Sequence, residues 1–298
     1  MDQGASILAK LKNHAKASDI SYQHCLQLFF QEEFLRRLSK SRYIDNFVLK
    51  GGLFIYTLTG FESRATVDID FLLQNQDGNP KHIDDVIAEI IATPTGINDI
   101  VILDARKTKQ ITPQRQYMGV STQIIGRIKN VRVPFNVDIG VGDVVVPAAI
   151  KRQVKTQLNE FDPPVVMTYS LESAIAEKFD AILQRLELTG RMKDFYDIYY
   201  LAQNFDFSGA HLQRAINDTL QTRQTPHNED SFLRVIELKD DLEMKVKWRY
   251  FLKTIGDAEL SFDQVIDQID QFLSPVYHVM MNGRVWQSAW SAKKQIWQ

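Results

Sequence analysis

The spacing of hydrophobic residues changes partway along the chain, and this change constrains the fold more than any other feature. Up to about residue 162, stretches with helical spacing are interspersed with short stretches in which apolar and polar residues alternate, the pattern of a strand. After Pro163-Pro164, nearly every apolar pattern repeats at three and four residues, as in helices. We therefore predict an α/β domain over residues 1–162 and a helical domain over residues 163–298.

The same spacing locates the individual elements. We expect helices at 5–17, 21–40, 53–59, 81–92, 171–187, 192–203, 210–221, 231–253, 262–273 and 284–297. Strands are expected at 47–49, 67–73, 97–103, 117–128 and 131–139. The last two strands flank Lys129-Asn130 and should form a β-hairpin.

Composition excludes several classes of protein. The chain has 44% hydrophobic and 24% charged residues, as globular proteins do, and its net charge of -2 gives no sign of a general affinity for nucleic acid. Cys25, the only cysteine, lies in an apolar helical run and is expected in the core. The N-terminus has no signal-peptide pattern, and no apolar run approaches the roughly 20 residues that span a bilayer. We therefore expect a cytoplasmic protein without a membrane partner.

Two aspartates share one predicted strand. Side chains alternate between the faces of a strand, so Asp68 and Asp70 should point one way while Val67, Ile69 and Phe71 point into a core. Adjacent carboxylates repel each other unless a cation neutralises them, and Mg²⁺ prefers such oxygen ligands while leaving positions for phosphates. This pattern indicates metal-assisted nucleotidyl transfer; the alternative is a solvated face on an edge strand.

Residues upstream of this pair favour the metal site. Gly51-Gly52 precedes it, with fifteen residues between Gly52 and Asp68, and glycines let backbone N–H groups approach a phosphate closely. Arg64 lies four residues before Asp68. It either contacts phosphate or pairs with Glu62.

A third carboxylate lies on a later strand. The apolar residues of 131–139 face one way and Asp138 faces the other, so a neighbouring strand would bring Asp138 beside Asp68 and Asp70. Pro134 favours an edge position or the first part of that strand.

Charged residues interrupt the apolar stripes of two helices in the second domain. Lys178 lies within the stripe of 171–187, and Asp194 lies within the apolar arc of the next helix, with Asp197 nearby on one face. Buried charges need partners. Lys178 therefore either binds a triphosphate or forms a structural ion pair with Asp194 or Asp197.

The C-terminal segment combines tryptophans with basic residues. Trp286, Trp290 and Trp297 recur at helical spacing. Such aromatic and basic groups can stack on unpaired bases, but they more often pack a last helix onto its own domain; a face for an antitoxin is a third alternative.

Together these motifs resemble a known family. A Gly-Gly turn, an Asp-x-Asp strand and a third acidic residue on a later strand form the active-site pattern of the DNA polymerase β-like nucleotidyltransferase fold. The chain resembles the AbiEii/AbiGii-type toxins of type IV toxin–antitoxin and phage-abortive systems in Leu49-Lys50-Gly51-Gly52, Arg64-Ala65-Thr66-Val67-Asp68-Ile69-Asp70-Phe71, Glu177-Lys178 and Arg191-Met192-Lys193-Asp194-Phe195-Tyr196-Asp197. The resemblance runs from about Leu49 to Leu201, and Ala65 departs from the Ser or Thr that often follows the arginine.

The resemblance implies a fold, a reaction and a set of roles. The first domain would hold a mixed sheet with flanking helices, and the helical domain would complete the active-site cleft. The implied toxin transfers a nucleotide from an NTP to RNA, with tRNA as the acceptor that the resemblance suggests. Its cofactor would be Mg²⁺ or Mn²⁺, and a cognate antitoxin would neutralise it. The implied metal ligands are Asp68, Asp70 and Asp138; the implied nucleotide-binding residues are Gly51, Gly52, Arg64, Thr66, Lys178 and Asp194; Lys178 and Asp197 join the three carboxylates as catalytic residues.

Three alternatives remain open at this point. A protein of the same fold could bind NTP as a regulatory or interaction protein without catalysis, although such proteins usually lose one of the carboxylates. The acceptor of the nucleotide could be a protein. A glycosyltransferase could use Asp-x-Asp with Mn²⁺, but the Gly-Gly turn and the helical second half argue against it.

Overall fold

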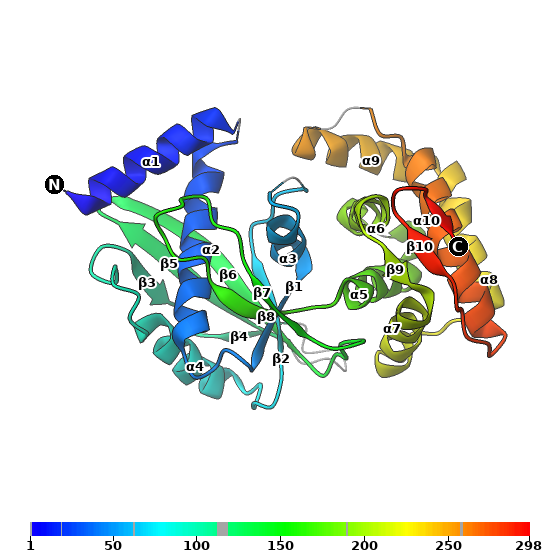
Figure 1. Cartoon of the computed structure of the whole chain (residues 1–298), viewed down its shortest axis with the longest axis horizontal. Helices are drawn as coiled ribbons and strands as arrows, with labels where there is room; N and C mark the ends of the chain where they lie inside the picture. Colours follow the sequence, from blue (N-terminus) through cyan, green and yellow to red (C-terminus); the bar gives the residue numbers. More distant parts are fainter. Residues whose placement is uncertain (1, 19, 62, 112–118, 189, 257–258) are drawn as a thin grey trace. The chain divides into compact units, whose positions relative to one another are not determined.

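A computed structural model describes residues 2–18, 20–61, 63–111, 119–188, 190–256 and 259–298 of the chain (Figure 1). It divides into two compact units. The first comprises Met1–Gly142 and Ala149–Tyr169, and the second comprises Asp143–Ala148 and Ser170–Gln298. This division differs from the predicted boundary at residue 162, because the strand that follows Pro163-Pro164 pairs within the sheet of the first unit.

A mixed eight-stranded sheet forms the centre of the first unit, in the order β3-β5-β6-β2-β1-β8-β7, with β4 also paired to β5. Its strands are β1 (Phe47–Lys50), β2 (Ile69–Leu73), β3 (Ile102–Ala105), β4 (Lys109–Ile111), β5 (Gly119–Ile128), β6 (Val131–Val141), β7 (Ile150–Gln153) and β8 (Val165–Thr168). Strand β2 is antiparallel to β1 and parallel to β6. The mixed sheet with flanking helices is therefore confirmed.

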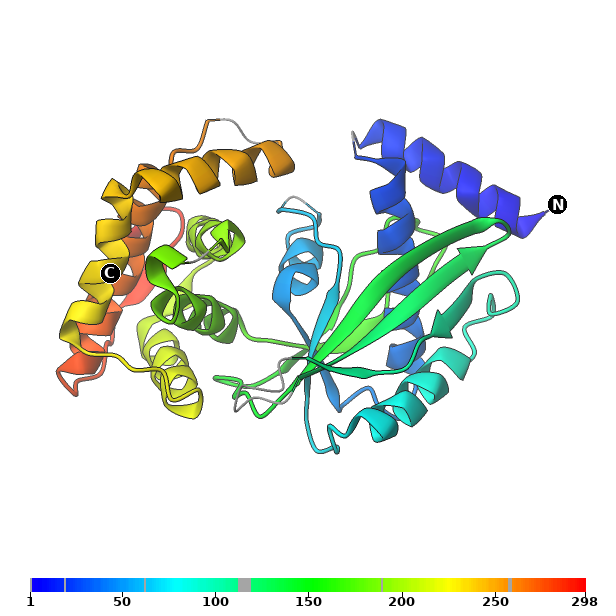
Figure 2. The ribbon, with the colours of Figure 1, turned by 180° about the vertical axis from the view of Figure 1, so that it is seen from behind.

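Four helices accompany this sheet: α1 (Gln3–Ala17), α2 (Tyr22–Lys40), α3 (Gly51–Leu58) and α4 (Pro80–Ala92). Helix α2 is buried along most of its length and packs against β6, β8, α1 and α4, as both views show (Figure 1 and Figure 2). Side chains cap the starts of α1, α2 and α4, where Asp2, Ser21 and Asn79 accept bonds from backbone N–H groups. Cys25 is buried in α2, as expected.

The predicted hairpin forms between β5 and β6, and the turn places Lys129 at a positive φ of 53°. Residues 117 and 118 of the predicted strand lie outside the described residues. Pro134 lies in β6 before the stretch that pairs with β2, which starts at Val137. The missing N–H of Pro134 therefore interrupts no ladder with β2.

Two predicted strands begin later than the alternation implies. Val67 and Asp68 precede β2, and the Val67 side chain is 61% exposed, so the expectation that it points into the core is wrong. The chain bends there before its ladders with β1 and β6 begin. The strand predicted at 97–103 also begins later. The Ile97 carbonyl accepts bonds from the N–H groups of Ile100 and Val101 in a turn, and the strand begins at Ile102.

Helix α2 also buries charged residues. Glu33 accepts bonds from Arg36 and Arg37 at 2.9 and 2.8 Å. Glu32 lies 4.0 Å from Arg36 and accepts a bond from the Gln157 N–H, but its Oε2 atom has no hydrogen-bond partner among the described residues. Burial is the main cause that raises the pKa of Glu32 to about 7, against the lowering effects of Arg36 and Gln157.

We expect Glu32→Gln to stabilise the protein above pH 7. A carboxyl whose pKa is raised in the folded state binds its proton more tightly there than in the unfolded chain, so stability falls as pH rises between the two values. The gain should be on the order of 3 kcal/mol at high pH and should vanish below about pH 4.5. Urea unfolding at several pH values measures it; a gain that does not depend on pH would contradict this cause.

The second unit is mostly helical. Its helices are α5 (Leu171–Leu183), α6 (Met192–Asn204), α7 (Gly209–Thr222), α8 (Glu229–Glu237), α9 (Leu242–Ile255) and α10 (Phe262–Met281), with short 3-10 helices at Leu186–Leu188 and Leu238–Asp240. It departs from the all-helical expectation in a three-stranded sheet of β9 (Phe207–Ser208), β10 (Ala289–Ser291) and β11 (Ile296–Trp297). No helix in the described part of the chain is both long and apolar enough to cross a bilayer.

The C-terminal tryptophans pack onto their own unit, which was one of the alternatives for this segment. They do so from strands rather than from the predicted helix. The predicted helix at 284–297 is wrong, because Trp290 and Trp297 are cross-strand partners in β10 and β11. Trp290 is buried and donates to the Ala202 carbonyl at 2.8 Å, while Trp297 stacks on Phe272 with ring centroids 5.8 Å apart.

Candidate active site

A row of polar residues crosses four neighbouring strands of the first unit. Ser121 on β5 pairs with Asp138 on β6, Asp138 pairs with Asp70 on β2, and Asp70 pairs with Lys50 on β1. Residues that pair directly across strands have their side chains on the same face of the sheet. The structure thus places Asp138 beside Asp70, through the parallel pairing of β6 with β2.

Hydrogen bonds hold two of the three carboxylates. Asp68 lies just before β2, and its Oδ1 atom accepts a bond of 3.0 Å from Nδ2 of Asn136. The Oδ1 atom of Asp138 accepts a bond from the Ser121 hydroxyl. Asn136 and Asp138 are two residues apart on β6, so both point to the face that carries Asp70.

The Gly-Gly pair begins α3 and lies against these residues. Gly51 has a φ of 66°, and a Cβ atom there would lie 2.1 Å from Oδ2 of Asp70. At Gly52 a Cβ atom would lie 2.9 Å from Oγ1 of Thr66 and 3.4 Å from Nη1 of Arg64. The two glycines therefore let the start of α3 approach Asp70, Thr66 and Arg64 closely. Glu62, the alternative partner of Arg64, lies outside the described residues.

The donor chemistry of this face fits a divalent cation. Asp68, Asp70 and Asp138 offer the hard oxygen atoms that Mg²⁺ prefers, and all three are half-buried. Within the described residues, no three Asp, Glu, His or Cys side chains are already gathered around one point. Binding through all three would therefore require their side chains to rotate toward a common point.

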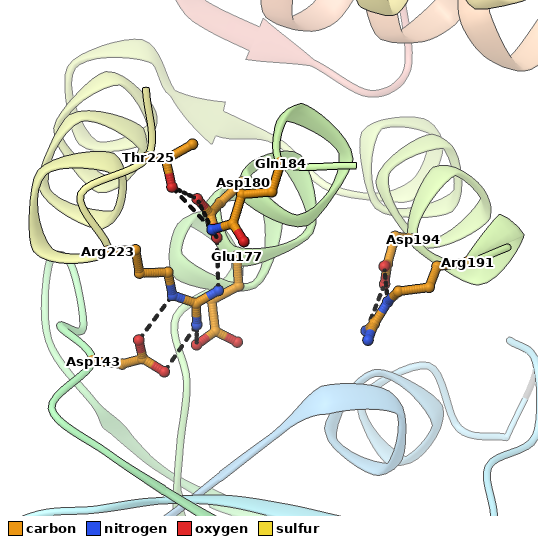
Figure 3. Close-up of polar contacts among 8 residues, drawn as sticks. All are labelled: Asp143, Glu177, Asp180, Gln184, Arg191, Asp194, Arg223 and Thr225. Atoms are coloured by element: carbon orange, nitrogen blue, oxygen red, sulfur yellow. Dashed lines mark hydrogen bonds and ion pairs between the residues drawn. The ribbon is translucent and has the colours of Figure 1, made fainter. Parts of the chain in front are cut away.

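In the second unit, Lys178 lies in an ion-pair network. Its Nζ atom bonds to Asp197 and lies 3.5 Å from Oδ1 of Asp194, and all three residues are buried. Arg191 pairs with Asp194 at 2.5 Å (Figure 3). Burial alone would raise the pKa of Asp194, but the charges of Lys178 and Arg191, with the hydrogen bond from Arg191, lower it overall. The ion pair proposed as the structural alternative is thus present with both aspartates.

A second network, absent from the sequence expectations, surrounds Arg223 (Figure 3). Its guanidinium bonds to Asp143 through two nitrogens, at 2.9 Å each, to Glu177 at 2.6 Å and to Asp180 at 2.9 Å. Asp180 also accepts bonds from Thr225 and Gln184. Burial lowers the pKa of Arg223, but the three carboxylates more than reverse this and raise it.

The two networks explain the adjacent charges Glu177 and Lys178. These neighbours in α5 have different partners: Glu177 pairs with Arg223 and Lys178 with Asp194 and Asp197. The sequence contains no motif from which the Arg223 network could be recognised, because the partners of Arg223 lie 43 to 80 residues away.

Comparison with known proteins places the chain in a family. A family model described as the nucleotidyl transferase AbiEii toxin of a type IV toxin–antitoxin system matches residues 33–268. No curated protein matches the chain. The chain is similar in fold to a crystal structure of a candidate nucleotidyltransferase from H. pylori, with 12% identity and a TM-score of 0.53 over 89% of this chain and 98% of that one. JHP933 from Helicobacter pylori also matches, with 13% identity and a TM-score of 0.48 over 88% and 95%.

The family match spans most of the chain and includes the Gly-Gly turn, the three carboxylates and both motifs of α5 and α6. At 12% identity the H. pylori structure supports the fold alone. The chain therefore belongs to the AbiEii family of nucleotidyltransferase toxins of type IV toxin–antitoxin systems.

Proposed function

We propose that this nucleotidyltransferase transfers a nucleotide from an NTP to RNA, with tRNA as the acceptor class, and thereby inhibits translation until a cognate antitoxin neutralises it. The observation that carries the proposal is the direct pairing of Asp70 with Asp138 on parallel strands, at the point where Gly51 closely approaches Asp70. Two adjacent carboxylates on one face need a cation, and nucleotidyl transfer from an NTP uses one.

The residues take separate roles. Asp68, Asp70 and Asp138 hold Mg²⁺ or Mn²⁺, which when bound would neutralise negative charge on the phosphates. The backbone at Gly51 and Gly52 binds phosphate with Arg64 and Thr66, the two side chains that lie against Gly52.

The ion-pair network of the second unit supplies the remaining roles. Lys178 binds phosphate, and its contacts with Asp194 and Asp197 fix the position of its ammonium group. Asp197, which bonds directly to Lys178, orients the lysine or accepts the proton of the attacking hydroxyl.

The proposal is tested by the transfer of label from each α-³²P NTP, with Mg²⁺, onto total RNA and total protein. We expect a labelled RNA band of tRNA size that Asp68→Ala does not produce. The same variant should remain folded, because it removes a repelled carboxylate. Label on a protein would change the acceptor, and NTP binding without any transfer would favour a regulatory protein of the same fold.

A further inference from the structure

The backbone immediately before Asp68 is held by two side chains from α2. The carbonyl oxygen of Val67 accepts a bond from Nε2 of Gln31 at 2.8 Å and another from Nε2 of Gln27. Gln27 and Gln31 are four residues apart, one turn of α2, so both reach the same carbonyl. One peptide group, the one between Val67 and Asp68, thus receives two donors from a single helix.

Burying these two glutamines carries a cost. Gln27 is 7% exposed and Gln31 is fully buried, and the Oε1 atom of Gln31 has no hydrogen-bond partner among the described residues. An unpaired buried amide oxygen destabilises the folded state, because it has lost its hydrogen bonds to water. A carbonyl oxygen has two lone pairs and can accept both donors, and two donors from one helix fix the direction of the peptide more closely than one would.

The need for this support follows from the position of Asp68. Asp68 lies before β2, where neither ladder of that strand fixes its backbone, whereas Asp70 is paired with Lys50 on one side and Asp138 on the other. The Val67 side chain is exposed and packs little. Side-chain bonds therefore replace the missing ladder at this point of the chain.

We infer that Gln27, Gln31 and Asn136 form a clamp that positions Asp68 as a metal ligand. Gln27 and Gln31 fix the peptide before Asp68, and Asn136 fixes one oxygen of its carboxylate. Both kinds of contact use neutral donors, so they orient the carboxylate without cancelling its charge. The inference rests on the proposed role of Asp68 in metal binding.

The test measures the binding of Mn²⁺ alone, by electron paramagnetic resonance, to the wild-type chain and to a Gln27→Met/Gln31→Met variant. We expect the affinity of the variant to fall by about 10-fold or more, as loss of residues that orient metal ligands generally causes. Gln157→Met is the matched control, because Gln157 is also buried and donates to a backbone carbonyl, that of Cys25. It should bind Mn²⁺ as the wild type does.

Asn136→Ala tests the clamp without altering the buried face of α2, and we expect a similar loss of affinity. If the glutamine variant and Asn136→Ala bind Mn²⁺ like the wild type while Asp68→Ala does not, the clamp is overturned and the metal role of Asp68 stands. If Asp68→Ala also binds like the wild type, the metal role itself fails. The melting temperature of each variant is compared with that of Gln157→Met. This comparison shows whether a variant that binds Mn²⁺ weakly is still folded.

Discussion

Replacing Asp70 by asparagine is expected to lower nucleotide transfer by more than about 100-fold, because residues that only support metal ligands already cost 10- to 100-fold when removed. Asp70 pairs directly with Asp138, and asparagine keeps the shape of the side chain while removing its charge. Like charges opposite each other on a sheet destabilise it by a few tenths of a kcal/mol to about 1 kcal/mol. The melting temperature without metal should therefore stay the same or rise slightly.

The measurements are the initial rate of label transfer and the melting temperature, both with and without Mg²⁺. The wild type should gain stability from Mg²⁺ and the variant should gain less, since a ligand stabilises only the state that binds it. Asp85→Asn is a suitable control, because Asp85 is exposed on α4. A melting temperature that falls together with activity would show that Asp70 is structural.

The sheet around this site could be predicted because alternation reports which side chains share a face. The pattern of 131–139 separates the buried Val133, Phe135, Val137 and Ile139 from Asp138, and the structure agrees. Alternation does not report where a ladder starts. Val67 continues the apolar pattern of Ile69 and Phe71, yet the strand begins only at Ile69, so the Val67 side chain is exposed.

Contacts between residues far apart in the sequence could not be predicted where no motif marks the residues. Gln27 and Gln31 look like ordinary polar residues on a helix until the fold brings Val67 to them, 36 to 40 residues away. Strands β7 and β8 are only four residues each, and β8 directly follows Pro163-Pro164, which favours a linker over a strand. Their omission placed the end of the first domain at Pro163-Pro164, before β8.

The C-terminal tryptophans show a different limit. Spacings of four and seven residues suit one face of a helix, but Trp290 and Trp297 meet across a turn in which Gln295 has a φ of 55°. Residue spacing alone does not distinguish a stripe along a helix from a pair across a hairpin. The ion pair of Lys178 could be predicted, because a charge inside an apolar stripe needs a partner and Asp194 lies inside the apolar arc of the next helix, with Asp197 nearby.

Replacing Arg223 by methionine is expected to destabilise the protein by about 3–5 kcal/mol, the usual effect of removing one partner from a buried ion pair. The change leaves Asp143, Glu177 and Asp180 close together without their shared cation. Asp180 keeps its bonds from Thr225 and Gln184, but these neutral donors do not offset its charge. Guanidinium unfolding near pH 7.5 measures the loss.

Arg214→Met is the matched control, because Arg214 lies on α7, which ends at Thr222 just before Arg223. Arg214 is 70% exposed, and its pair with Asp218 should contribute less than about 1 kcal/mol.

The loss of stability in Arg223→Met should also depend on pH. Three crowded carboxylates bind protons more tightly in the folded state than in the unfolded chain, so the stability of the variant falls as pH rises through their titration. Relative to the wild type, the variant should therefore be closer in stability near pH 4.5 than near pH 7.5, around the ordinary range of carboxyl groups. A deficit that stays constant over this range would mean that lost packing of the arginine side chain, rather than charge repulsion, accounts for the effect.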